Sequence, residues 1–329
     1  MPRPFLLRLL PEPLVQRLKG LLAPYVDAAL EEYLPPFSER NALPGLLSGA
    51  IDGKHIPMSP TKANCIVAAP PAGGPVWADG FAPPPRSLWY EYCDTLDRFM
   101  EIGRHNAGTM RAILTRGGGD IGRGDRVLDF GCGAGPVIRC LKEIALEGEV
   151  WGVDVSVEHV TWCQQHLSPP FRFAVTTLLP HLPFEDRYFD LVYAGSVFSH
   201  ISEMADAWLL ELSRVIRPGG RLYVTLVTKQ SLHDYLEKWP SLGFSREARA
   251  AFTPEELSSN FDMLVIRRTP WQHAVFDLEF FRRKCDGMFN VVSVTPNAYS
   301  FQWALLLERK VGRRRGDARA ASTEQGERA

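Results

Sequence analysis

The fold is decided by the sequence RVLDFGCGAGPVIR, which runs from Arg126 to Arg139. Its first half is a short apolar run of the kind that forms a buried strand. The chain then breaks into three alternate glycines, and apolar residues resume at helical spacing after Pro136, a residue that suits a first helical turn. Strand, glycine turn and helix in this order predict a doubly wound α/β sheet with a nucleotide site at the carboxyl end of its first strand.

The composition predicts a globular core domain with an appendage. The chain has 329 residues, of which 45% are hydrophobic, and its net charge is −1 from 37 basic and 38 acidic side chains. This balance argues against broad electrostatic binding to nucleic acid, although it does not exclude a local basic patch. Six scattered cysteines without a C-x-x-C pair indicate reduced thiols. We therefore expect a cytoplasmic protein.

The N-terminal 85 residues form the expected appendage. Residues 1–34 carry two helical apolar patterns with interleaved arginines, and residues 35–86 are rich in Pro, Gly and Ala. The start is too short and too interrupted for a signal peptide, and no apolar run is long enough to span a bilayer. We expect the helices to dock on the main domain or on a second subunit, which would leave the oligomeric state open between monomer and dimer; a membrane-surface helix is the alternative.

The remaining chain alternates between strand and helix patterns. The expected strands are 126–130, 149–153, 172–175, 190–194, 221–227, 290–294 and 301–309. The expected helices are 136–146, 157–166, 204–215 and 275–285, after one or two helices within 88–114. This alternation predicts a mostly parallel, seven-stranded, Rossmann-like sheet with helices on both faces. The short link 296–300 forces the last two strands to be antiparallel.

Three domain-level segments follow from this pattern. We expect residues 86–310 to form the main domain. Within it, the polar, helix-prone stretch 229–270 is expected to be an insert that serves as a lid or recognises the acceptor substrate. Residues 311–329 have almost no large apolar side chains and carry a cluster of arginines. We expect this tail to be disordered, because it cannot bury enough apolar surface to fold.

The glycine spacing distinguishes between two cofactor families. A dinucleotide site needs G-x-G-x-x-G, which would place its third glycine at the position of Pro136. The observed spacing D-x-G-x-G-x-G instead resembles motif I of the class I S-adenosylmethionine-dependent methyltransferases. Asp154 closes the second expected strand, where its carboxylate can accept hydrogen bonds from both ribose hydroxyls. The alternative for Asp154 is a cap on the following helix.

The resemblance extends over residues 86–309. Further stretches that look like family motifs are 182–184 (LPF), 189–193 (FDLVY), 197–201 (VFSHI), 211–215 (ELSRV) and 217–220 (RPGG). The sequence SVFSH at 196–200, preceded by EIGR at 101–104, resembles a bacterial subgroup that modifies small molecules or glycans. The resemblance therefore implies methyl transfer from S-adenosyl-L-methionine to a small-molecule or glycan acceptor.

The resemblance also implies a set of cofactor-binding residues. They are Asp129, Gly131, Cys132, Gly133, Gly135, Asp154, Val155, Thr177, Ala194 and Arg104. We interpret Cys132 as a small residue that fills space, and Arg104 either as a partner of the cofactor carboxylate or as an ordinary surface arginine. Family members often hold the adenine with an acidic or amide residue after the third strand, whereas this chain has Thr176 and Thr177. We assign no metal site.

The acceptor side of the predicted site has one candidate base. His200 follows the fourth strand by six residues, so it is expected near the mouth of the site and could take a proton from the acceptor. The alternative is a structural histidine bonded to a loop carbonyl. Tyr193 and Phe198 either face the cofactor cation or pack in the core. The absence of a D/N-P-P-aromatic tetrapeptide and of a Pro-Cys nucleophile argues against methylation of nucleobases.

Two other functions compete with an active methyltransferase. A methyltransferase-like binding or scaffold protein would have the same glycine turn without turnover. A nicotinamide-dependent oxidoreductase would share the α/β sheet, although Pro136 disfavours its glycine register.

Overall fold

The computed structural model describes residues 77–89, 93–240, 243–266 and 272–311. The expected N-terminal helices, most of the Pro-rich connector and any dimer contact through them lie outside these residues. The expected disorder of the basic tail beyond Val311 lies outside them too.

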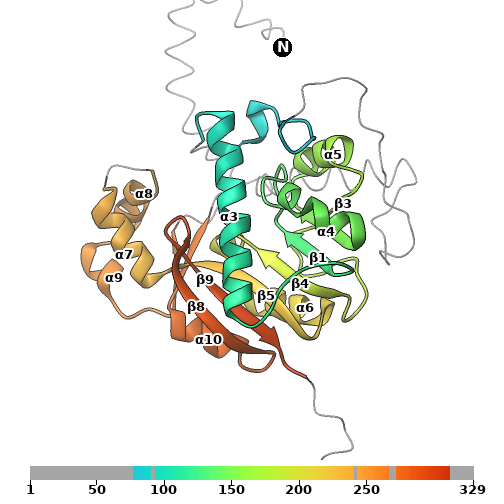
Figure 1. The fold of residues 1–329 in the computed structure, drawn as a ribbon. Coiled ribbons are helices and arrows are strands. Elements are labelled where there is room, and N and C mark those ends of the chain that lie inside the picture. The colour runs from blue at the N-terminus through green and yellow to red at the C-terminus, as the bar shows by residue number, and fades with distance from the viewer. Residues whose placement is uncertain (1–76, 90–92, 241–242, 267–271, 312–329) are drawn as a thin grey trace, which may run out of the picture.

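The described residues contain a nine-stranded sheet that includes the predicted Rossmann-like core (Figure 1). The strands are β1 (Arg126–Phe130), β2 (Glu149–Asp154), β3 (Arg172–Val175), β4 (Phe189–Ala194), β5 (Ile216–Thr228), β6 (Met263–Ile266), β7 (His273–Phe276), β8 (Phe289–Tyr299) and β9 (Gln302–Arg309). β3, β2, β1, β4 and β5 are parallel neighbours in that order. β9 then pairs antiparallel with β5 and with β8. The predicted seven strands, with an antiparallel last strand, are therefore confirmed.

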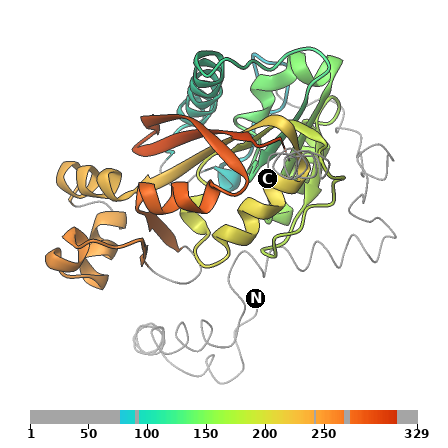
Figure 2. The same cartoon turned by 90° about the horizontal axis from the view of Figure 1, so that it is seen from below.

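Helices cover both faces of this sheet. The helices of the described residues are α3 (Leu96–Arg116), α4 (Lys142–Glu147), α5 (Val157–His166), α6 (Ala205–Val215), α7 (Lys229–Lys238), α8 (Gly243–Ala251), α9 (Pro254–Ser258) and α10 (Leu278–Cys285), with 3-10 turns η2 (Arg86–Leu88), η3 (Ile138–Leu141) and η4 (Phe198–His200). Val127 packs with α3, α4 and α5, whereas its neighbour Leu128 packs with α6 and α10. In Figure 2 the sheet accordingly separates the teal α3 from the yellow α6 and the orange α10. Successive strand residues point to opposite faces, so both faces are apolar.

The segment after β5 differs from the prediction. It forms α7, α8 and α9 around a small core of their own, and this group lies to one side of the main sheet (Figure 1). It also contributes two strands, because β7 pairs parallel with the end of β5 and β6 pairs antiparallel with β7. The helix predicted over 275–285 is wrong at its start. Val275 and Phe276 belong to β7, and the helix begins only at Leu278, because the Asp277 side chain accepts the Phe280 N–H and caps it.

The helix predicted at 136–146 is also divided. The chain first makes the 3-10 turn η3, in which the Cys140 N–H donates to the Val137 carbonyl at 3.0 Å, and only then the α-helix α4. Arg139 in this turn is buried, and its guanidinium makes hydrogen bonds of 2.5 and 3.0 Å to the Asp79 carboxylate. The last residues of the N-terminal extension are thereby attached to the segment that follows the glycine turn.

Candidate functional site

The glycine turn is attached to the neighbouring strand by its backbone. The N–H groups of Gly131 and Cys132 both donate to the Val153 carbonyl of β2, at 2.8 and 3.0 Å. Gly131 has φ +82°, and a Cβ placed on it would lie only 2.4 Å from Cγ2 of Val197. Only glycine fits here, because a side chain would be strained by the backbone angle and blocked by the loop after β4.

Asp154 joins the glycine turn to the start of α5. One carboxylate oxygen accepts the Gly133 N–H and the other accepts the Ser156 N–H, each at 2.8 Å. The N-cap of α5 is Ser156, whose hydroxyl accepts the His159 N–H, so Asp154 is not the helix cap. Each carboxylate oxygen has a second lone pair, and the two together can accept a pair of neighbouring hydroxyls. Asp154 therefore has the chemistry that a ribose clamp requires.

The environment of the Asp129 carboxyl shows whether a positively charged cofactor would fit the site. Its carboxyl is buried beneath the glycine turn, and Oδ2 has no hydrogen-bond partner among the described residues. Burial raises the pKa of Asp129 to about 8, the charge of Asp154 adds to this, and a hydrogen bond from the Ile138 backbone opposes it. An isolated buried carboxyl of this kind fits a ligand with a sulfonium and an ammonium group, because either cation would stabilise its ionised form.

The affinity for S-adenosylmethionine is expected to depend on pH through Asp129. The free protein holds this carboxyl protonated below a pH of about 8, and cation binding releases the proton, so the affinity should rise toward that pH and level off above it. Calorimetry over this pH range measures the effect. The Asp129→Asn variant is the control, since it has no proton to release. An identical pH dependence in both proteins would contradict the assignment.

The other predicted cofactor-binding residues around the glycine turn are small or packed against neighbouring elements. Cys132 is buried, and its thiol and that of Cys163 lie 3.6 and 3.4 Å from the Gly133 carbonyl oxygen. A Cβ on Gly135 would lie 2.5 Å from Leu167, which places this glycine against α5. Ala194 ends β4 as a buried small residue, and Val155 is half-buried directly after Asp154. Their direct contacts with a cofactor stay predictions.

The two threonines after β3 have different environments. The Thr177 hydroxyl accepts the Leu179 N–H at 3.2 Å and so closes a local turn. Thr176 is buried and donates its N–H to the Asp154 carbonyl at 2.9 Å, while its hydroxyl has no partner in the described part of the chain. Thr176 therefore joins Thr177 as a candidate on the adenine side. Only Thr177 is predicted from the sequence as a cofactor-binding residue, because the environment of the Thr176 hydroxyl depends on the fold.

His200 is held by Gln272, the residue that directly precedes β7. Its Nδ1 lies 2.9 Å from the Gln272 carbonyl oxygen, and the Gln272 amide donates back to the His200 carbonyl at 2.6 Å. The carbonyl can only accept, so the neutral ring carries its proton on Nδ1 and leaves Nε2 as a proton acceptor. Although His200 is exposed, the protein packed around its ring lowers its pKa, and the Gln272 carbonyl and Asp154 oppose this. The lowered pKa favours the neutral form of the ring.

Tyr193 and Phe198, the two aromatic candidates for facing the cofactor cation, pack in the core instead. Tyr193 is buried and stacks on Tyr223 with 5.2 Å between ring centroids. Phe198 is fully buried and packs edge-on against Phe281. The core-packing alternative is confirmed for both.

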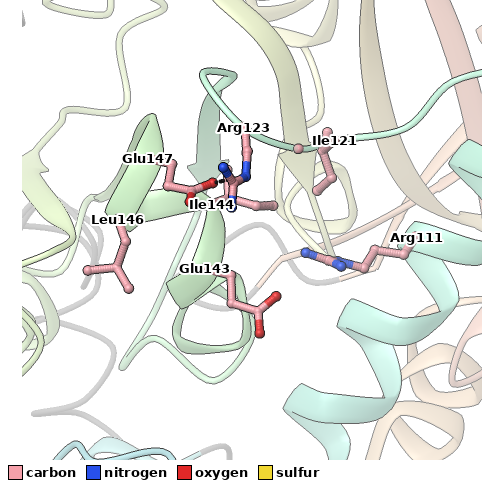
Figure 3. A pocket seen from close by; sticks show the side chains of 8 residues that line it. Arg111, Ile121, Arg123, Glu143, Ile144, Leu146 and Glu147 are labelled. Atoms are coloured by element: carbon pink, nitrogen blue, oxygen red, sulfur yellow. Dashed lines mark ion pairs between the residues drawn. The ribbon is translucent and has the colours of Figure 1, made fainter.

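Arg104 lies on the outer side of the glycine turn. It is exposed and lines a cavity of about 550 Å³ together with Pro136 and Arg139. A neighbouring pocket of about 310 Å³ continues along α4 (Figure 3), where the Arg111 side chain extends from α3 toward this helix. Neither cavity is lined by Asp154 or His200. The pairing of Arg104 with a cofactor carboxylate stays a prediction.

Comparison with known proteins agrees with this geometry. Residues 128–224 match the family model described as a methyltransferase domain. The ubiquinone/menaquinone biosynthesis C-methyltransferase of Chromobacterium violaceum is 31% identical over 139 residues, which are 41% of this chain and 55% of that protein. The malonyl-[acyl-carrier protein] O-methyltransferase of Hahella chejuensis is 25% identical over 132 residues, 40% of this chain and 47% of that protein. The chain thus spans about half the length of these relatives.

A search of solved structures finds similar chains as well. The PH0226 protein of Pyrococcus horikoshii superposes with a TM-score of 0.46 and 18% identity, over 63% of this chain and 91% of that chain.

Proposed function

We propose that this chain, which contains a class I S-adenosylmethionine-dependent methyltransferase domain, transfers the methyl group of S-adenosylmethionine to a small-molecule or glycan acceptor. The observation that carries the proposal is the Asp154 carboxylate, held between the Gly133 N–H and the Ser156 N–H with its remaining lone pairs free for hydroxyls. The cofactor, when bound, supplies a methyl group already activated on a sulfonium, so that transfer is an in-line displacement.

The chain's own residues have three tasks in this proposal. Asp154 binds the ribose, and the glycine turn lets the cofactor approach the backbone closely. Asp129 stabilises positive charge in a buried site, where an ion pair is stronger than in water. His200 takes a proton at Nε2 from the molecule that receives the methyl group, while the Gln272 carbonyl oxygen accepts the hydrogen bond from Nδ1–H. Because little covalent chemistry is left to the protein, alignment of the acceptor supplies most of the acceleration.

The acceptor is proposed only as a class. The names of the two relatives differ in the reaction they state, since one is a C-methyltransferase of ubiquinone/menaquinone biosynthesis and the other a malonyl-[acyl-carrier protein] O-methyltransferase. Both matches are partial, so neither acceptor is transferred to this chain. We propose that the insert of α7, α8, α9, β6 and β7 recognises the acceptor, because Gln272 connects it directly to His200. The acceptor atom is proposed to be oxygen or nitrogen, since both need a base.

We propose that the protein is cytoplasmic, and free thiols are in keeping with this location. Cys93, Cys132, Cys140, Cys163 and Cys285 are free thiols in the described part of the chain. None of the helices in that part is long and apolar enough to cross a bilayer.

The test uses labelled cofactor and the extract of source cells. S-adenosylmethionine labelled in its methyl group is incubated with the full chain and the extract, and labelled products are identified. The Asp154→Ala variant is expected to bind the cofactor about 1.5 kcal/mol more weakly, roughly tenfold, because two backbone N–H groups lose their acceptor and the ribose loses its clamp.

Each outcome of this experiment decides between functions. Label in a small molecule or glycan, reduced about tenfold in the Asp154→Ala protein at low cofactor concentration, supports the proposal. Cofactor binding without any labelled product would favour the non-catalytic binding protein. Binding of a nicotinamide cofactor in a fluorescence titration, with none of S-adenosylmethionine, would favour the oxidoreductase.

A further inference from the structure

The loop after β4 contains a serine in an unusual backbone conformation. Ser196 has φ +58°, in the left-handed region that residues other than glycine rarely adopt. Such a conformation persists only where the surroundings hold it in place, and it is found most often at functional sites. The contacts of Ser196 therefore show what holds this loop.

Three residues from three segments form a closed ring of hydrogen bonds, to which Ser196 contributes both its backbone N–H and its hydroxyl. The Ser196 N–H donates to the Thr225 hydroxyl at 2.7 Å, and that hydroxyl donates to Oε1 of Gln302 at 2.8 Å. The Gln302 amide then donates to the Ser196 hydroxyl at 2.7 Å. Thr225 is completely buried and Gln302 is 6% exposed, so the bond between these two side chains is shielded from solvent. Ser199 adds a bond from its hydroxyl to the Ser196 carbonyl at 3.1 Å.

At the end of β4, the hydrogen-bonded ring takes the place of the backbone hydrogen bonds that join β4 to β5. Ala194 pairs with Val224 as the last matched position of β4 and β5, and Thr225 is the next residue of β5. A backbone N–H at such an end needs another acceptor, and the Thr225 side chain supplies it. Gln302 reaches the same point from the antiparallel strand β9, which pairs with β5. The turn of the chain at Ser196 is therefore fixed by β5 and β9 together.

The turn at Ser196 directs two residues of the proposed site. Val197 follows it and lies against Gly131, close enough that a single added methyl on that glycine would collide with it. The 3-10 turn η4 comes next and ends at His200. One loop thus closes the glycine turn on one side and presents the proposed base on the other.

We infer that Thr225 and Gln302 are positioning residues, which hold Ser196 in the left-handed conformation so that Val197 supports the cofactor turn and His200 faces the site. This inference rests on the proposed function, since it assumes that the glycine turn binds S-adenosylmethionine. It assigns no contact of Thr225 or Gln302 with the cofactor. Their effect passes through the backbone of residues 195–197.

The test compares two substitutions of Thr225 that differ in one hydroxyl. Thr225→Val keeps the volume but leaves the Ser196 N–H and the Gln302 carbonyl oxygen unpaired. Thr225→Ser keeps the hydroxyl and loses only a methyl group. The dissociation constant of S-adenosylhomocysteine, measured by calorimetry on the full chain, is expected to rise about tenfold in the Val variant and to stay within about twofold of wild type in the Ser variant.

A second substitution separates backbone positioning from general stability. Glycine adopts a positive φ without strain, so Ser196→Gly combined with Thr225→Val is expected to recover most of the lost affinity although the ring stays broken. A purely structural role of Thr225 would give no such recovery. If the Val variant does not fold, Gln302→Met, which breaks the ring at another corner, takes its place with the same expectation.

The outcomes distinguish this inference from the proposed function. Wild-type chain that does not bind S-adenosylhomocysteine overturns the proposed function. Wild-type binding together with unchanged affinity in both the Thr225→Val and the Gln302→Met protein overturns the inference alone. Loss of affinity in the Val variant that Ser196→Gly does not recover also overturns it.

Discussion

Replacing His200 with Asn is expected to lower methyl transfer by about 10²–10⁴-fold, the usual contribution of a positioned general base. The Asn amide can still donate to the Gln272 carbonyl, so the loop stays anchored while the proton acceptor at Nε2 is lost. The rate is measured with the acceptor fraction that the wild-type chain labels. The affinity for S-adenosylmethionine should not change, because no cofactor contact is assigned to His200.

The pH dependence gives this prediction a second readout. The neutral imidazole is the active form, and its pKa is lowered below the ordinary value, so the wild-type rate should be constant near pH 7 and fall only in more acidic solution. This acidic limb should be absent from the residual activity of the Asn variant. His233→Asn is the matched control, since His233 is an exposed residue of α7 paired with Glu237. A full rate in the His200→Asn protein would identify His200 as a purely structural residue.

Replacing Gly131 with Ala is expected to weaken cofactor binding at least 100-fold, or about 3 kcal/mol. An alanine at position 131 would have to adopt φ +82°, which strains a residue with a side chain. Its Cβ would lie 2.4 Å from Cγ2 of Val197, so either the turn or the loop after β4 must move. Both form the proposed site. Calorimetry gives the change in affinity, and thermal unfolding gives the change in stability.

Two further variants separate the strain from the collision. Gly118→Ala introduces the same left-handed strain at φ +74° just after the C-terminal end of α3, where an added Cβ has no atom within 4 Å, and should lose stability without losing cofactor affinity. Adding Val197→Ala to Gly131→Ala should restore part of the affinity, because it removes the colliding methyl group but not the strain. Equal affinity in wild type and Gly131→Ala would show that this turn does not bind the cofactor.

The parts of the fold that are local in sequence were predictable. The strand, the alternate glycines and the carboxylate that ends β2 lie within 30 residues, and the β4 and β5 patterns follow from continuous apolar runs. The antiparallel last pair followed from the length of one short link. In each case the structure depends on interactions between residues that are close together in the sequence.

The parts that failed depend on tertiary contacts. Val275 and Phe276 belong to an apolar stretch that continues past Asp277 toward Phe280 and Phe281, and periodicity alone does not divide it into a strand and a helix. The division comes from pairing of β7 with β5 and from the Asp277 cap. β6 and β7 are each only four residues long, and apolar runs this short do not show by periodicity whether they form a strand or part of a helix.

The site shows the same limit. Asp154 and the glycines follow from a spacing, but the Thr176 hydroxyl, which has no partner among the described residues, and the partner of His200 do not. Gln272 is 72 residues from His200, and Gln302 is 106 residues from Ser196. Contacts at such separations leave no periodic signal in one sequence. They appear only when the sheet brings β4, β5, β7 and β9 to a common edge.

The central claim is that the glycine turn and Asp154 bind S-adenosylmethionine, and titration calorimetry of the full wild-type chain with this cofactor tests it most directly. We expect a dissociation constant well below about 1 mM, and roughly tenfold weaker binding by the Asp154→Ala protein. Wild-type binding weaker than about 1 mM, or equal affinity in the two proteins, would contradict the account.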